Sequence, residues 1–265
     1  MASSPLGRPT RGTTGTNRLR RIDRWIAQLP VLRTAADPLV VDLGYGASAT
    51  TSLELYDRLA KVRPDVEVIG IEIEPTRVAL AAASSKPGVS FRLGGFEVPL
   101  PDTRKATVIR ALNVLRQYDE GEVLENWHRM VGRLQPGGVL IEGTCNEVGR
   151  VCSWVDVTSD GPRSLTVSLR LADLDEPSIV AERLPKVLIH RNVPGERVHG
   201  FLTELDRHWR YNASLGSFGP SQRWIAVAKA LKSEGWPVLG TPSRWKLGEL
   251  TVAWESVAPT GFSYR

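Results

Sequence analysis

The stretch that decides the fold is residues 40–51, which read VVDLGYGASATT. An apolar run ends at the acid Asp42, and two glycines, Gly44 and Gly46, follow one residue apart. A segment typical of a helix comes next. Glycines at a tight turn from strand to helix allow a ligand to approach the bare backbone. The sequence therefore predicts a ligand-binding turn here, and the question is which ligand it holds.

Strand and helix signals alternate around this turn. Apolar, β-branched runs typical of buried strands are followed by segments with apolar residues three and four positions apart. This alternation predicts an α/β fold: a doubly wound, mostly parallel seven-stranded sheet, with helices on both faces and a modified C-terminal portion. The expected strands are 38–43, 66–73, 89–93, 106–111 and 139–141, then 151–157, 165–171 and 249–255; the expected helices are 17–29, capped by Asn17 and ended by Pro30, then 50–62, 75–83, 120–134, 198–211 and 224–232.

The domain boundaries follow from composition. Residues 1–16 are rich in Gly, Pro, Thr and Ser and are expected to be a flexible N-terminal segment. Residues 17–265 are expected to form a single domain, because no internal repeat or low-complexity linker interrupts them. Its cofactor-binding half would cover about 36–145 and its substrate-side half 146–265.

Bulk properties narrow the class of protein. The 265 residues carry a formal net charge of +5 and a pI of about 9.4. This balance fits a basic surface for nucleic acid or a mildly basic cytoplasmic protein, and the even spread of charge favours the second. Two cysteines are too few for a disulfide framework and match no zinc pattern. No apolar run approaches the roughly 20 residues of a membrane span.

The turn GYGASA fits the G-x-G-x-x-G/A pattern of dinucleotide-binding proteins, yet three features favour another ligand. Asp42 stands before the first glycine, where a carboxylate suits a cationic group better than a pyrophosphate. Glu72 ends the next strand, where an acid can accept both hydroxyls of a ribose. The late run LQPGGVL at 134–140 indicates a helix stop and a tight turn before a fifth strand.

Taken in order, these residues resemble the class I S-adenosylmethionine-dependent methyltransferases, in particular an actinobacterial branch. The family's motifs are written here as VVDLGYG, VIGIEIEP and LQPGGVLIEG, and the resemblance covers about residues 36–145. It implies that the protein uses S-adenosyl-L-methionine and releases S-adenosyl-L-homocysteine.

The resemblance also implies roles for single residues. Gly44, Tyr45 and Gly46 would hold the methionine part of the cofactor, and Asp42 would contact its ammonium group directly or through water. Glu72 would bind the ribose hydroxyls, with Glu74 as the nearby alternative. Arg110, at the end of the fourth strand, would line the cleft through its backbone.

Two parts of the cofactor have less obvious partners. Where the family often has an acid that binds the adenine amino group, this chain has Gly95. The backbone of Gly95 and Phe96, or the ring of Phe96 stacked on adenine, would take its place. The alternative is that Phe96 is a core residue. The cofactor carboxylate needs a cation or hydroxyl donors, which Arg11, Thr13 or Arg18 could supply if the N-terminal segment covers the cleft. The alternative is a solvated tail.

Catalytic candidates are few. Methyl transfer is an in-line displacement that needs alignment and, for a hydroxyl acceptor, a base; it requires no metal. Asn113 follows the fourth strand, but Val114-Leu115-Arg116 replaces the Pro-Pro-Tyr of amine-methylating enzymes, so Asn113 lines the site or caps a loop. His190 is a candidate base, with a buried structural histidine as the alternative.

The sequence therefore predicts a methyltransferase acting on a small molecule, with O- or N-methylation open and no membrane partner. A tRNA or rRNA methyltransferase is the nearest alternative, because arginines and tryptophans mix in the C-terminal third. A non-catalytic S-adenosylmethionine-binding regulatory protein is the second, since no clear base is present. An NAD oxidoreductase is the weakest.

Overall fold

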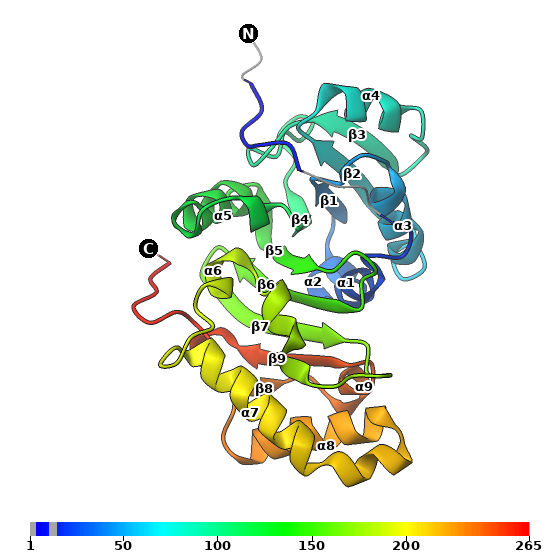
Figure 1. Ribbon diagram of the computed structural model, residues 1–265. Coiled ribbons are helices and arrows are strands. Elements are labelled where there is room, and N and C mark those ends of the chain that lie inside the picture. Colours follow the sequence, from blue (N-terminus) through cyan, green and yellow to red (C-terminus); the bar gives the residue numbers. More distant parts are fainter. Residues whose placement is uncertain (1–3, 11–14, 265) are drawn as a thin grey trace. The chain divides into compact units, whose positions relative to one another are not determined.

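The computed structural model describes residues 4–10 and 15–264, which divide into two compact units (Figure 1). The first contains the chain up to Glu142 together with Glu147–Gly149 and Val157–Asp160; the second contains Gly143–Asn146, Arg150–Asp156 and the chain from Gly161 onward. Whether they act as the single domain expected over 17–265 stays a prediction.

The first unit is built on a parallel sheet. Its strands follow the order β3-β2-β1-β4-β5, and the pairs β1–β2, β1–β4 and β2–β3 are parallel. This order belongs to doubly wound α/β folds, in which the chain reverses direction across the sheet between β1 and β4. The strands are β1 (Leu39–Leu43), β2 (Glu67–Glu72), β3 (Val89–Leu93), β4 (Ala106–Leu112) and the first part of β5 (Leu134–Cys145).

Helices of this unit pack against the sheet through their apolar residues. All five residues of β1 and all seven of β4 are buried, as strands covered on both faces require. α3 packs against β2 and buries Leu55 and Leu59, and α4 packs against β3 (Figure 1). The helical elements are α1 (Arg20–Ile26), α2 (Pro30–Thr34), α3 (Thr50–Leu59), α4 (Pro75–Ala82), η1 (Leu115–Gln117), η2 (Glu120–Glu122) and α5 (Val123–Val131).

The second unit has an antiparallel sheet with two long helices. Its strands follow the order β6-β7-β9-β8, and β9 is antiparallel to both β7 and β8. α7 packs against α8, and Trp209 meets Trp224 edge to face at 6.0 Å between ring centroids. The elements are β6 (Val151–Thr158), β7 (Gly161–Leu169), η3 (Pro177–Arg183), α6 (Lys186–Ile189), α7 (Arg197–Tyr211), η4 (Ala213–Phe218), α8 (Pro220–Ser233), β8 (Val238–Leu239), α9 (Pro242–Trp245), β9 (Glu249–Ala253) and η5 (Trp254–Ser256).

The α/β class and the parallel order around the glycine turn are confirmed, and several details are corrected. Among the described residues there are nine strands instead of seven, and those of the second unit add antiparallel pairs. Asn17 does not cap α1, which begins at Arg20; its side chain accepts a hydrogen bond from Arg58. The first helix ends at Ile26, before Pro30, and Pro30 opens α2 instead, because proline fits the first turn of a helix.

Candidate cofactor-binding site

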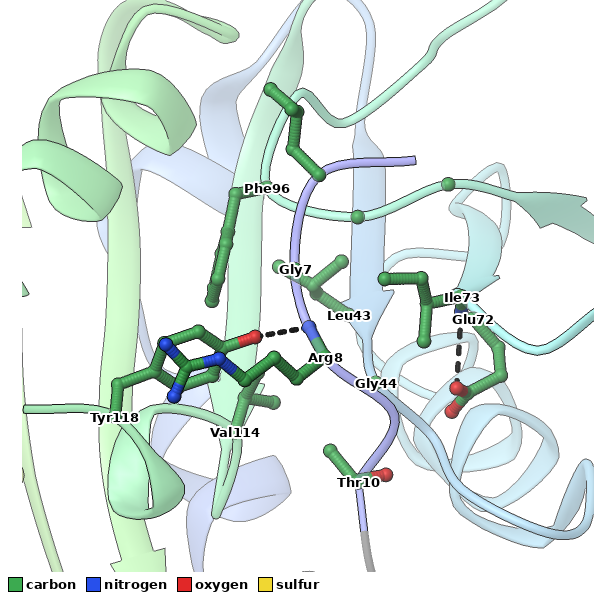
Figure 2. A pocket seen from close by; sticks show the side chains of 13 residues that line it. Gly7, Arg8, Thr10, Leu43, Gly44, Glu72, Ile73, Phe96, Val114 and Tyr118 are labelled. Carbon is green, nitrogen blue, oxygen red and sulfur yellow. Dashed lines mark hydrogen bonds between the residues drawn. The ribbon is translucent and has the colours of Figure 1, made fainter. Parts of the chain in front are cut away.

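Two adjoining pockets lie where the strands of the first unit end. Both are lined by residues that follow β1 and β4, on the two sides of the point where the strand order reverses, which is where doubly wound sheets bind ligands. Pocket A is lined by Leu43, Gly44, Glu72, Ile73, Gly94, Gly95, Phe96, Val114 and Tyr118, with Leu6, Gly7, Arg8 and Thr10 of the N-terminal segment (Figure 2). Pocket B is lined by Thr10, Arg18, Leu19, Asp42, Gly44, Tyr45, Gly46, Thr51, Leu112 and Asn113.

The glycine turn separates the two pockets. Gly44 has φ +70° and Gly46 has φ +89°, a region that side chains rarely adopt. A Cβ at Gly44 would also lie 2.7 Å from a methyl carbon of Val114. The Gly44 N–H donates to the carbonyl of Ile71 at 2.7 Å, which joins the turn to β2. Glycine is therefore required at residue 44 by both conformation and space.

Glu72 is held against this turn from the end of β2. Its side chain is 1% exposed, and one carboxylate oxygen accepts the Gly46 N–H at 3.0 Å. The other accepts the N–H of Ile73 at 3.0 Å and lies 3.6 Å from the guanidinium of Arg77. The amide that a pyrophosphate would need is thus already used by a carboxylate, which disfavours a dinucleotide at the turn.

Asp42 and Arg110 belong to a buried ion-pair network. Arg110 is fully buried; its Nε donates to Asp42 at 3.0 Å, and another guanidinium nitrogen donates to Asp23 of α1. Asp42 also accepts hydrogen bonds from the hydroxyls of Thr51 and Ser52, each at 2.9 Å. Burial opposes the charge on Arg110, but the two carboxylates outweigh it and raise its pKa. Asp42 still lines pocket B; Arg110 lines neither pocket, and Leu112 and Asn113 form the wall there instead.

The end of β3 carries an acid that the sequence analysis missed. Gly95 stands at the position of the family's acid, but Glu97 turns its carboxylate back toward it and accepts the Gly95 N–H at 2.8 Å. Phe96 is 3% exposed, meets Tyr118 edge to face at 5.2 Å and lines pocket A. The sequence signal that could have identified this acid is Glu97, which stands two residues after the family's usual position and whose carboxylate the turn brings back to Gly95.

Other predicted residues gather in pocket B. Asn113 lines it with φ +63°, a conformation that asparagine tolerates better than most residues. Arg18 lines it too, so this pocket offers a cation beside the carboxylate of Asp42. Tyr45 packs edge to face against Phe91 at 5.3 Å, and burial raises the pKa of its hydroxyl. Arg11 and Thr13 lie outside the described residues.

His190 belongs to the second unit. It is exposed at the end of α6, with Lys186 Nζ 3.2 Å from its Nε2, so it is not the buried histidine of the alternative interpretation. Its role as a base stays a prediction.

Glu204, His208 and Glu234 also gather in the second unit, with possible metal-ligand atoms within 4.8 Å of one another. The guanidinium of Arg207 binds both carboxylates, which makes the group an ion-pair network.

Comparisons with known proteins give the following. No protein-family model matches the chain, and no curated protein matches it. Among solved structures, the chain is similar to human N-acetylserotonin methyltransferase in complex with S-adenosylmethionine (23% identity, 47% of this chain, 33% of that chain, TM-score 0.36). It is also similar to the N-methyltransferase NodS from Bradyrhizobium japonicum (18% identity, 49% of this chain, 68% of that chain, TM-score 0.35). A third similar structure is the CcbJ methyltransferase from Streptomyces caelestis (18% identity, 60% of this chain, 73% of that chain, TM-score 0.37).

The chain spans about a third of the length of the first of these, and at such TM-scores the likeness decides neither fold nor activity. Within the described residues, no helix is long and apolar enough to cross a membrane.

Proposed function

We propose that this chain is a class I S-adenosylmethionine-dependent methyltransferase that acts on a small molecule. The observation that carries the proposal is Glu72, buried at the end of β2 with its carboxylate against the glycine turn. A carboxylate at this place in a doubly wound sheet accepts ribose hydroxyls. Because it also uses the Gly46 N–H, a nucleoside without a pyrophosphate fits the turn better than NAD does.

Each part of the cofactor would have its own residues. The adenine would lie in pocket A, where the Phe96 N–H and the Glu97 carboxylate offer one donor and one acceptor. The methionine part would lie in pocket B, with its ammonium group near Asp42 and its carboxylate near Arg18. Methyl transfer itself would need only an aligned acceptor, and Asn113, one of the polar residues that line pocket B, would orient it.

A small-molecule substrate is favoured over tRNA or rRNA by the burial of the tryptophans. Four of the five tryptophans of the C-terminal third, Trp209, Trp224, Trp245 and Trp254, are each at most 4% exposed, so they fill the core of the second unit and offer no surface for stacking bases. Trp236 is partly exposed and packs against Phe201 at 5.6 Å between ring centroids. Arg223 covers the ring of Trp209 at 3.7 Å, which is a packing contact within the unit.

Isothermal titration calorimetry with S-adenosylhomocysteine tests the cofactor. Hydrogen bonds to a charged group are worth about 1.5–3 kcal/mol, so Glu72→Gln is expected to weaken binding by roughly 10- to 150-fold. Glu74→Gln is the matched control, two residues further along and outside both pockets, and should bind as the wild type does. Equal losses in both variants, or tighter binding of NADH than of S-adenosylhomocysteine, would refute the assignment.

Turnover is tested separately. Tritiated S-adenosylmethionine is incubated with the protein and either a small-molecule extract or total RNA. Label in the small-molecule fraction alone supports the proposed substrate class. Label in RNA, with binding that weakens steeply with salt, would identify the nucleic-acid alternative, and cofactor binding without label in either fraction would favour the regulatory one.

A further inference from the structure

The N-terminal segment, residues 4–10, lies inside pocket A. Figure 2 shows it passing between Phe96 and Tyr118 on one side and Ile73 and Glu72 on the other. The space that remains is about 20 Å³, on the scale where one water needs roughly 10–15 Å³. A nucleoside and this segment therefore cannot occupy pocket A together.

The segment uses the polar groups that a nucleobase would need. The Phe96 N–H donates to the carbonyl of Leu6 at 2.9 Å, and the Leu6 N–H donates to Glu97 at 2.8 Å. A Cβ at Gly95 would lie only 1.9 Å from the Leu6 carbonyl oxygen, so the backbone of the segment rests directly on that glycine. The backbone N–H and carbonyl of Leu6 thus bind Glu97 and the Phe96 N–H, the same two groups that would bind the edge of a base.

Further contacts fix the other end of the segment. Arg77, which lies beside Glu72, donates to the Thr10 carbonyl at 3.0 Å. The Arg8 N–H donates to the hydroxyl of Tyr118, and the Arg8 guanidinium lies 4.9 Å from the centre of that ring and 3.2 Å from a carboxylate oxygen of Glu122. The segment is held from the base side of the pocket to its ribose side.

These contacts are of a kind that can be broken. Leu6 is 44% exposed and the side chain of Arg8 is 58% exposed, so the segment buries little apolar surface. The Leu6 bond to Glu97 and the Arg8 ion pair with Glu122 are exposed, and those to Tyr118 and Arg77 are only part-buried, so water can replace them at modest cost.

We propose that residues 4–10 are an internal competitor for the nucleoside part of the cofactor, which must leave pocket A before S-adenosylmethionine binds. The proposal rests on the proposed function. The binding-competent fraction of the protein is then small, and the apparent affinity falls by that fraction.

Gly7→Val tests the competition because it changes only the segment and none of the residues that would still line pocket A once the segment has left. Gly7 has φ +137°, and a Cβ there would lie 3.0 Å from the Tyr118 hydroxyl oxygen, so valine disfavours the seated segment. The matched control is Gly216→Val in η4, where a Cβ meets nothing within 4 Å. Arg8→Ala removes the ion pair with Glu122 and the guanidinium contact with the Tyr118 ring but keeps the backbone N–H bond to the Tyr118 hydroxyl, so it should act in the same direction but less strongly.

Two readouts are combined. Hydrogen exchange at the Phe96 amide reports whether the segment is seated, and calorimetry with S-adenosylhomocysteine reports the affinity. We expect Gly7→Val to accelerate exchange and to tighten binding by about tenfold or more, while Gly216→Val changes neither. Added S-adenosylhomocysteine should protect the amide again in Gly7→Val.

Contrary results separate the two proposals. Faster exchange with unchanged or weaker binding would overturn the competition and leave the cofactor assignment standing; weaker binding would make the segment part of the site. Unchanged exchange in Gly7→Val would show that the segment does not cover Phe96, which also overturns it. Faster exchange with no binding by any variant would refute the cofactor assignment, and the competition with it.

Discussion

Replacing Arg110 by methionine should destabilise the first unit more than any other single loss of an ion pair in it. Arg110 is fully buried and holds Asp42 at 2.7 Å and Asp23 through a second contact, and both carboxylates are themselves buried. Methionine fills similar volume without charge. Asp42 would keep only hydroxyl partners, and Asp23 would keep only Arg58 at 2.6 Å.

The magnitude follows from the burial. Breaking a buried ion pair by removing one partner costs about 3–5 kcal/mol, because a charge is left without compensation in a region of low dielectric. The matched control is Arg104→Met. Arg104 also binds two acids, Asp37 at 2.6 Å and Glu67 at 2.9 Å, but its side chain is 27% exposed, so its loss should cost about 1 kcal/mol or less.

The destabilisation caused by the loss of Arg110 should depend on pH. Burial already raises the pKa of Asp23, while Arg110 and Arg58 lower it, so removing Arg110 raises that pKa further. A carboxyl whose folded pKa lies above its unfolded value loses stability as the pH rises through that window. The destabilisation should therefore be smaller at pH 5 than at pH 8 in urea unfolding followed by circular dichroism. A loss no larger than that of Arg104→Met, or one that does not change with pH, would refute the reasoning.

Three further outcomes are expected. Burial raises the pKa of Glu142 to about 8 from 4.5, so the free energy of unfolding should fall by about 1.4 kcal/mol per pH unit as the pH rises between these values. Urea unfolding of Glu142→Gln should lack this slope, and an unchanged slope in the variant would contradict the assignment. Asn113→Gly keeps the positive φ and removes the amide, whereas Asn113→Ala disfavours the backbone as well; if the amide orients the acceptor, both should lose methyl transfer while Asn113→Gly still binds S-adenosylhomocysteine. Gly44→Ala should lower the free energy of unfolding by about 1–3 kcal/mol and remove most binding of S-adenosylhomocysteine. Adding Val114→Ala to that variant should remove the clash but not the backbone strain, so full recovery in the double variant would contradict the role of φ.

The sequence predicted those parts of the site that depend on short-range pattern. Gly44 and Glu72 lie at strand ends as expected, because each directly follows or ends a buried strand, and parallel strands bring their carboxyl ends to one edge of the sheet. Their roles in binding stay predictions. The parallel pairing of the strands around β1 followed from their alternation with helices. These features need only a few neighbouring residues to be recognised.

Contacts between distant residues were not predicted. Asp23 and Arg110 lie 87 positions apart, and neither residue type nor spacing announces that one guanidinium will bind both Asp23 and Asp42. Glu97 was overlooked because the family pattern places its acid at residue 95. The seated N-terminal segment contacts residues 67 to 114 positions further along the chain, and a composition rich in Gly and Pro indicated only irregular structure.

The two pockets therefore differ in what a ligand would have to displace. In pocket B the carboxylate of Asp42 is fixed by a buried network that no ligand of this size could replace without a cost of several kcal/mol, so the methionine part must bind to what is already there. In pocket A the Phe96 N–H and the Glu97 carboxylate are bound by an exposed segment whose hydrogen bonds exchange at small cost. Selectivity for the methionine part would then depend on the rigid pocket, and the control of affinity on the one that the chain itself fills.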